Sequence, residues 1–471
     1  MKRDFRWHDY ITISINWFAL TVRSQGLVLI VPLLVQQFVG EEQKGTYFGI
    51  IRLWALMVAL LVQAFMGLLS DRSTSRWGRR RPFIFIGALS EAIIIVLIGF
   101  TVGMEGMSGY WLLFTLYILA MVASNTSHAA TQGFIPDLVP DERKGIFSGI
   151  KAFLELPAPL LFISFVIGKM VGREQFWAAF ITLAVVVVVS ALITMFVREE
   201  PQEEAEPINW QPFLRLLVMT GVFTVVILGS GQIVKWAFQA VVGMAEPGRS
   251  ILVAGIGVAG MGVAILLGVL VSIRVGIGKD FGENRSFAWW VVSRLAFLVG
   301  ANNLASFMVY YFQEKFPEIQ GGEASDLVAQ VLVFVGIAIL LAALPGGLLS
   351  DRVGKKALIA TSGVLAALGT LVVVLSSGMT MIYVGGTVIG LAIGLFYASN
   401  WALGTTIVPK QEAAGYLGLS NLAGAGAGAI GAYIGGPIGD GASFTLLMGI
   451  FGILFFLSMF ALLGIKEKKT A

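Results

Sequence analysis

Apolar stretches of at least 18 residues recur along this chain of 471 residues, and they constrain its fold more than any other feature. A helix needs about 20 apolar residues to cross roughly 30 Å of hydrocarbon. Only 13% of the residues are charged, whereas soluble domains have roughly 25%. A soluble enzyme is excluded, because so apolar a surface would aggregate. A transmembrane barrel is excluded too, because its alternating segments of about ten residues are missing. The sequence therefore predicts an all-α polytopic membrane protein.

The apolar stretches define fourteen predicted spans. A polar, acidic segment at 198–212 divides them into six before it and eight after it. The predicted spans are 11–39, 46–69, 83–103, 110–133, 145–170, 175–197, 213–242, 251–275, 287–312, 326–349, 357–377, 381–405, 413–436 and 443–464.

The distribution of basic residues predicts the topology. If all fourteen segments cross and the N-terminus is cytoplasmic, most of the 32 Lys and Arg residues fall in the inner loops and termini. Cytoplasmic loops of membrane proteins carry such an excess. Both termini are therefore expected to be cytoplasmic. The assignment is the same if 213–242 and 251–275 do not cross, because they form a pair.

An internal repeat explains the number of spans. The string Gly67–Arg72 returns unchanged as Gly347–Arg352, and each copy is followed by a glycine and a basic run, Gly78–Arg81 and Gly354–Lys356. Each copy lies between the second and third spans of a six-span set, so the chain contains two related halves with an inserted helix pair. We expect a six-helix N-terminal bundle (1–200), an acidic linker with two extra helices (201–285) and a six-helix C-terminal bundle (286–471).

These paired loops resemble the signature of the major facilitator superfamily. The longer first copy, at 70–84, also resembles the sucrose/proton symporters and the glycoside-pentoside-hexuronide cation symporters. The resemblance implies the major facilitator fold and transport by alternating access. It also implies a conformational latch, which is a network of charged loop residues that holds the transporter in one state. The residues at matching positions are Asp71, Arg72, Arg79 and Asp137, joined by Arg143, with Asp351 and Arg352 in the second copy.

Two departures from these relatives bear on coupling. Sodium-coupled members carry acidic residues on the second helix, but 47–69 contains none. Plant sucrose symporters use an acidic residue within the first helix, whereas here Asp9 precedes the span and Arg23 lies near its middle. The resemblance therefore favours protons as the coupling ion but does not identify the proton site.

Charged side chains inside the membrane are costly and are usually paired or functional. Glu155 falls about ten residues into the fifth span, near the midplane. It either forms a self-neutralising pair with Lys151 one turn earlier or serves as a proton-coupling carboxylate. Glu91 is a second candidate for proton coupling, or a structural partner for a basic residue.

The depth of two further basic residues within their spans suggests what each of them contacts. Arg23 is expected either to contact the substrate or coupling ion, or to pair with a carboxylate such as Glu155. Arg294, a turn and a half into its helix, is expected to extend to the cytoplasmic interface.

In the superfamily that this chain resembles, the first, fourth, seventh and tenth helices of the twelve-helix core line the substrate cavity. The resemblance therefore implies that polar residues on these helices bind a hydroxyl-rich solute. Asn125, His128 and Gln132 share one helical face by their spacing. The alternative is that each of these side chains only forms hydrogen bonds with neighbouring groups of the protein and does not bind a solute. The candidate substrate-binding residues are Arg23, Gln25, Asn125, His128, Gln132, Asn302, Asn303, Tyr397 and Asn400.

We therefore expect a proton-coupled secondary transporter for a small polar solute, and a sugar is the solute that we predict. The alternative is a facilitator or exporter of an amphipathic compound or a lipid. An enzyme is not expected, because metal motifs, nucleophile elbows and phosphate loops are missing, and neither is a metal, a cofactor or a nucleic-acid partner. The protein is expected to be a monomer in a prokaryotic cytoplasmic membrane.

Overall fold

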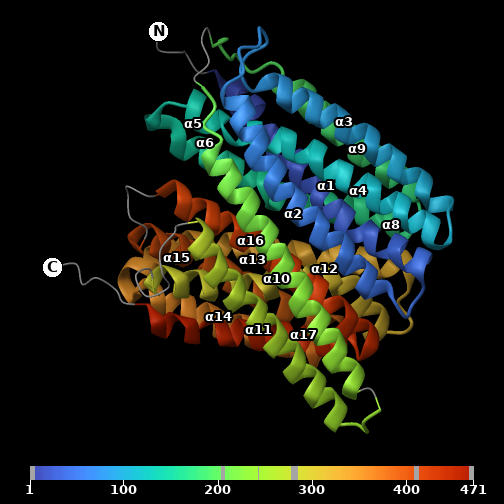
Figure 1. Ribbon diagram of the computed structural model, residues 1–471. Coiled ribbons are helices and arrows are strands. Elements are labelled where there is room, and N and C mark those ends of the chain that lie inside the picture. Colours follow the sequence, from blue (N-terminus) through green and yellow to red (C-terminus); the bar gives the residue numbers. More distant parts are fainter. Residues whose placement is uncertain (1–5, 203–206, 242, 277–284, 408–412, 466–471) are drawn as a thin grey trace. The chain divides into compact units, whose positions relative to one another are not determined.

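The computed structural model describes residues 6–202, 207–241, 243–276, 285–407 and 413–465. Every regular element in these ranges is a helix (Figure 1). The helices before the acidic linker are α1 (Trp7–Val39), α2 (Lys44–Asp71), α3 (Arg81–Gly99), α4 (Gly106–Gln132), α5 (Phe134–Leu138), α6 (Lys144–Glu155), α7 (Pro157–Phe162), α8 (Lys169–Gly172) and α9 (Phe176–Thr194). Those after it are α10 (Gln211–Val241), α11 (Gly248–Gly276), α12 (Arg285–Lys315), α13 (Gly321–Val353), α14 (Lys355–Val374), α15 (Met379–Ile407), α16 (Ala413–Gly441) and α17 (Phe444–Ser458).

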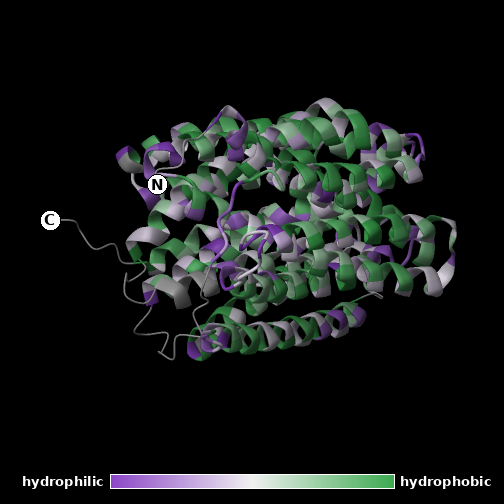
Figure 2. Cartoon of the chain, turned by 90° about the horizontal axis from the view of Figure 1, so that it is seen from above, coloured by the Kyte–Doolittle hydropathy of each residue, from purple (hydrophilic) through white to green (hydrophobic). Residues whose placement is uncertain are grey.

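Fourteen segments have the length of a membrane span, as the apolar stretches predicted. Thirteen are also apolar enough over their described residues, and α16, with 29 residues, is the fourteenth. In Figure 2, hydrophobic colour dominates along the helices, and hydrophilic residues gather near helix ends and in connecting segments. This distribution fits helices surrounded by hydrocarbon, since their backbone groups are satisfied within each helix.

The fifth predicted span, 145–170, is not one continuous helix. It consists of α6, α7, a π-helical turn (Ile163–Gly168) and α8. The break falls at Leu156, immediately before Pro157, the first residue of α7. Proline has no N–H and disfavours helical geometry in the preceding residue. The interruption therefore places Glu155 at the end of α6 rather than inside a regular helix.

The chain forms two compact units. Unit 1 contains Met1–Phe38, Val58–Trp210 and Gly321–Ala329. Within it, α3 packs along both α4 and α9. The start of α13 belongs to this unit, where Ser325 Oγ donates a hydrogen bond to the carbonyl of Leu29 at 2.7 Å.

Unit 2 contains Val39–Met57, Gln211–Gln320 and Gln330–Ala471. Within it, α14 packs along α15, and α12 packs along α16 and α17. The first part of α2 belongs here, because the carboxylate of Asp440 accepts hydrogen bonds from the backbone N–H groups of Gly45 and Thr46, both at 2.7 Å. The domain boundaries expected from the sequence remain a prediction.

The inserted pair, α10 and α11, packs together and against α16 within unit 2. The ring of Phe223 on α10 fills the space that side chains would need at Gly268 on α11 and Gly426 on α16. Glycine at these two positions lets three helices approach one another around one buried aromatic ring. This contact fixes the packing of the inserted helices against α16.

Candidate functional site

A buried ion pair lies inside unit 1 and joins α1 to α3. Arg23 Nε lies 2.6 Å from Glu91 Oε1, and the two side chains are only 8% and 2% exposed. Arg23 Nη2 also donates a hydrogen bond to Ser124 Oγ on α4. The expectation that Arg23 pairs with a carboxylate is confirmed, but the carboxylate is Glu91 and not the example Glu155. Burying both charges is tolerated because each compensates the other.

The polar face of α4 is held by α1. Asn16 Nδ2 donates to Ser127 Oγ at 3.1 Å and to Thr131 Oγ1 at 2.6 Å. Asn16 is not among the residues predicted from the sequence, because a single asparagine within a span gives no sign of its partners. These bonds lock two helices together and align the more accessible part of the face.

The three residues predicted to share a face of α4 differ in their surroundings. Asn125 donates to the carbonyl of Met121 in its own helix at 2.8 Å. His128 Nε2 lies 3.2 Å from Gln132 Nε2, and its ring meets Trp17 edge-on with centroids 5.3 Å apart. His128 and Gln132 thus form a joined polar pair, whereas the Asn125 amide is engaged by the backbone. Gln25 on α1 is half-buried.

Lys151 and Glu155 form the ion pair that their spacing allows. Lys151 Nζ lies 3.1 Å from Glu155 Oε2, with side chains 30% and 42% exposed. The same ammonium group lies 3.9 Å from the centroid of the Trp17 ring, a cation–π contact that joins α6 to α1. Glu155 is therefore a partly exposed carboxylate, in contrast to Glu91.

In unit 2, two of the predicted binding residues connect helices. Asn303 is fully buried, and its Nδ2 donates to the carbonyls of Val299 at 2.8 Å and Ala427 at 3.2 Å. Asn302 Nδ2 donates to the carbonyl of Gly424 at 3.2 Å. Both bonds to α16 fix its packing on α12.

The other polar group of unit 2 surrounds Arg294. Its Nη1 donates to Asn400 Oδ1 at 2.7 Å, and its guanidinium carbon lies 5.8 Å from the Trp290 ring and 5.5 Å from the Trp401 ring. Arg294 is 8% exposed. The expectation that Arg294 extends to the interface is wrong, because its side chain turns inward to Asn400. Tyr397, one turn before Trp401, is 37% exposed.

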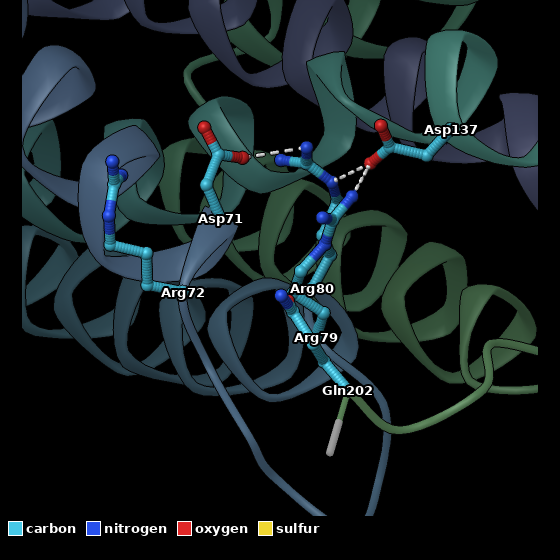
Figure 3. Close-up of a pocket in the computed structure, with 6 residues that line it drawn as sticks. All are labelled: Asp71, Arg72, Arg79, Arg80, Asp137 and Gln202. Atoms are coloured by element: carbon cyan, nitrogen blue, oxygen red, sulfur yellow. Dashed lines mark hydrogen bonds and ion pairs between the residues drawn. The ribbon is translucent and has the colours of Figure 1, made fainter. Parts of the chain in front are cut away.

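A charged network occupies the predicted latch, where Arg80 bridges two carboxylates (Figure 3). Arg80 Nη2 lies 2.7 Å from Asp71 Oδ1, and its Nε lies 2.5 Å from Asp137 Oδ2. Arg79 also pairs with Asp137. A cavity of about 360 Å³ is lined by these four residues with Arg72 and Gln202.

The bridging role of Arg80 was missed in the sequence. The run Gly78–Arg81 shows that basic residues gather there, but the side chain that enters the network depends on where α3 begins. Glu199 completes the site: its carboxylate accepts from the backbone N–H of Arg80 at 2.9 and 3.0 Å and of Arg81 at 3.2 Å. A carboxylate at a helix N-terminus compensates otherwise unpaired N–H groups.

The other latch candidates make different contacts. Arg72 turns away from the two carboxylates (Figure 3) and donates to the carbonyls of Pro207 at 3.4 Å and Leu68 at 3.5 Å. Arg143 Nη1 donates to Tyr10 Oη at 3.4 Å. In the second copy, Arg352 is exposed, and the side chain of Asp351 lies outside the described residues.

The glycine of each repeated loop has the same backbone role. Gly78 has φ +99° and Gly354 has φ +101°. L-residues with side chains rarely adopt such angles. Each glycine reverses the chain direction just before a helix that starts with basic residues, so the repeat preserves a turn as well as charges.

These features define a membrane transporter built from two related halves. They are the repeated helix sets, the glycine turns between the second and third helix of each set, and the charged pairs inside a bundle. The family model of the Major Facilitator Superfamily matches residues 14–313 and 291–471. The chain therefore belongs to this superfamily, which confirms the prediction from the loop motif. Its members are transporters and not enzymes.

Curated relatives match in parts of the chain. The sucrose transport protein SUC3 of Arabidopsis thaliana is 47% identical over 45 residues, 10% of this chain and 8% of the relative. The lactose permease of Lactobacillus helveticus is 25% identical over 185 residues, 35% of this chain and 28% of the relative. The chain thus matches less than a third of the length of either relative.

Solved structures match over nearly the whole chain. The inward-open xylose transporter XylE from E. coli has a TM-score of 0.64 at 15% identity and covers 98% of both chains. A peptide transporter of the POT type in complex with sulfate has a TM-score of 0.65 at 14% identity, over 98% of this chain and 95% of the other. At such identities the similarity establishes the fold alone.

Proposed function

We propose that the protein is a proton-coupled secondary transporter of a sugar or a similar hydroxyl-rich solute, working by alternating access. The observation that carries the coupling is the buried pair of Arg23 and Glu91. The relatives named for sucrose and lactose transport support a sugar as the solute.

The proposed coupling follows from the electrostatics of this pair. Protonation of Glu91 removes its charge, which frees Arg23 to bind another acceptor such as a solute oxygen. Because the two side chains are nearly inaccessible, neither state is stabilised by bulk water. Solute binding and protonation are therefore linked, and one changes the free energy of the other. Glu155 is the weaker candidate, since it is 42% exposed and Lys151 balances it within the same helix.

The solute is proposed to contact Arg23, Gln25, Asn125, His128 and Gln132 in unit 1 and Asn302, Asn303, Tyr397 and Asn400 in unit 2. His128 and Gln132 are the strongest members, because they offer a joined donor and acceptor beside the Trp17 ring. Aromatic faces beside polar groups suit the apolar faces and hydroxyls of a sugar. Asn303 is the weakest, because its amide is engaged by α16.

The latch is proposed to comprise Asp71, Arg79, Arg80 and Asp137, with Arg72, Arg143, Asp351 and Arg352 as further members. A monomer in a prokaryotic cytoplasmic membrane, with both termini inside, completes the proposal.

Proteoliposomes containing the purified protein test the function. Sucrose, lactose, xylose or myo-inositol is added outside, and uptake of the labelled sugar and external pH are recorded together. A transported sugar should raise the external pH. Uptake without any pH change would eliminate proton coupling. Failure of all four solutes to enter would exclude these neutral solutes as substrates and leave an acidic sugar or an amphipathic compound to be tested.

A matched pair of variants locates the coupling site. Glu91→Gln should abolish sugar-driven proton movement but retain exchange of sugar for sugar, because exchange needs no net proton transfer. Glu155→Gln should leave the proton movement largely intact. The reverse pattern would assign coupling to Glu155.

A further inference from the structure

Arg294 is a buried cation that the described residues of unit 2 do not neutralise. It is 8% exposed, and no Asp or Glu in the described part of the chain forms an ion pair with it. Its partners among the described residues are neutral: the Asn400 amide oxygen and the faces of Trp290 and Trp401. An uncompensated buried charge is strongly unfavourable, so an anion is the expected partner.

The polar atoms left unsatisfied around Arg294 are all hydrogen-bond donors. Arg294 Nε and Asn400 Nδ2 are buried without a hydrogen-bond partner, and so is Nε1 of Trp290, one helical turn before Arg294. The orientation of the Asn400 amide is fixed because its oxygen accepts from Arg294, which leaves only N–H groups to be satisfied. A ligand that fits must supply acceptors and negative charge, as a carboxylate does.

Arg23 in unit 1 offers the contrasting case. It is 7% exposed, close to the value for Arg294, but Glu91 neutralises it. Of these two similarly buried arginines, Arg23 is paired with a carboxylate, whereas Arg294 has no carboxylate partner among the described residues. Tyr397 and Trp401 border Arg294 and are 37% and 47% exposed, so the group lies beside an accessible part of unit 2.

We propose that Arg294 and Asn400 form an anion site, and that the transported solute carries a carboxylate, as an acidic sugar does. This inference rests on the proposed transport function and names the substrate class within it. Arg294 binds the carboxylate through its guanidinium, and Asn400 both orients Arg294 and donates its free N–H. A neutral sugar would leave the buried charge uncompensated.

The first test needs no ligand. Arg294→Met and Arg23→Met are compared by thermal melting of the purified protein. Arg294→Met should melt at or above the temperature of the wild type, because it removes an unneutralised charge. Arg23→Met should melt at a lower temperature than the wild type, because it leaves the carboxylate of Glu91 buried without its positive partner. A loss of melting temperature in Arg294→Met as large as that in Arg23→Met would overturn the inference, since Arg294 would then be satisfied by its neutral neighbours.

The second test uses glucuronate with glucose and galacturonate with galactose, because each pair differs only by a carboxylate in place of a hydroxymethyl group. At least one uronate should bind more tightly than its neutral partner. Arg294→Met should weaken that binding by roughly tenfold to a hundredfold, and Arg294→Lys should restore part of it. Equal binding of acid and neutral sugar, or unchanged uronate binding in Arg294→Met, would overturn the inference.

The outcomes separate this inference from the proposed function. Uptake of neutral sugars with no binding of either uronate would refute the anion site and leave sugar transport standing. Uronate binding without uptake of any sugar or uronate would refute transport and leave the anion site standing.

Discussion

Removing the charge of either Arg23 or Glu91 should destabilise the protein strongly, and removing both should not. At the 2.6 Å separation of these two groups, an effective dielectric constant of about 20 gives a Coulomb energy of about 6 kcal/mol. Much of this energy offsets the desolvation of the two charges. Removing one partner leaves the other buried and unpaired, which costs roughly 3–5 kcal/mol.

A double-mutant cycle measures the effect. The variants are Arg23→Met, Glu91→Leu and the combination, each followed by reversible denaturant unfolding in detergent micelles. We expect each single variant to lose about 3–5 kcal/mol and the double variant to lose clearly less than the sum. The cycle isolates the coupling between the two side chains.

Two results would refute this reasoning. Losses below about 1 kcal/mol in both single variants would show that water reaches the pair as it reaches an exposed salt bridge. A double variant whose loss equals the sum would show that the two side chains act independently.

Three further predictions follow from individual contacts. Arg80→Gln should lower the melting temperature more than Arg79→Gln, because Arg80 is less exposed and contacts two carboxylates; equal losses would contradict the bridging role. Gly354→Ala should cost about 1–2 kcal/mol from the backbone angle alone, and Gly78→Ala should cost more because the new methyl group also meets Glu199, as denaturant unfolding would show. Phe223→Ala should cost roughly 3–5 kcal/mol and increase protease cleavage in the segment before α10, whereas an unchanged cleavage pattern would mean that the inserted pair does not depend on this ring.

Much of the fold could be predicted from the sequence because each span is specified locally. Twenty consecutive apolar residues must be helical in hydrocarbon wherever they lie in the chain, so fourteen spans can be counted without tertiary information. The Gly67–Arg72 repeat is equally local, and it led to the superfamily. The sequence contains Pro157, which predicts a break in the helix. The fifth span was nevertheless expected to be continuous, because apolar residues predominate along its whole length.

The candidate site was less predictable, because its partners come from different helices. Lys151 and Glu155 are four residues apart on one helix, so their pair follows from helical geometry. Arg23 and Glu91 lie on separate helices, and nothing local distinguishes Glu91 from Glu155 as the partner. The depth of Arg294 in its helix predicts a side chain that reaches the interface, but depth does not indicate the direction in which a side chain points.

The sequence by itself determined that this chain spans a membrane in repeated sets of helices, because transfer into lipid depends on composition and length. Only the tertiary structure decided which charges meet, since an ion pair depends on helix rotation and packing that hydropathy does not encode. The same composition contains Arg23, which Glu91 neutralises, and Arg294, which no carboxylate of the described residues neutralises. The difference lies in the side chains that packing places beside each guanidinium group.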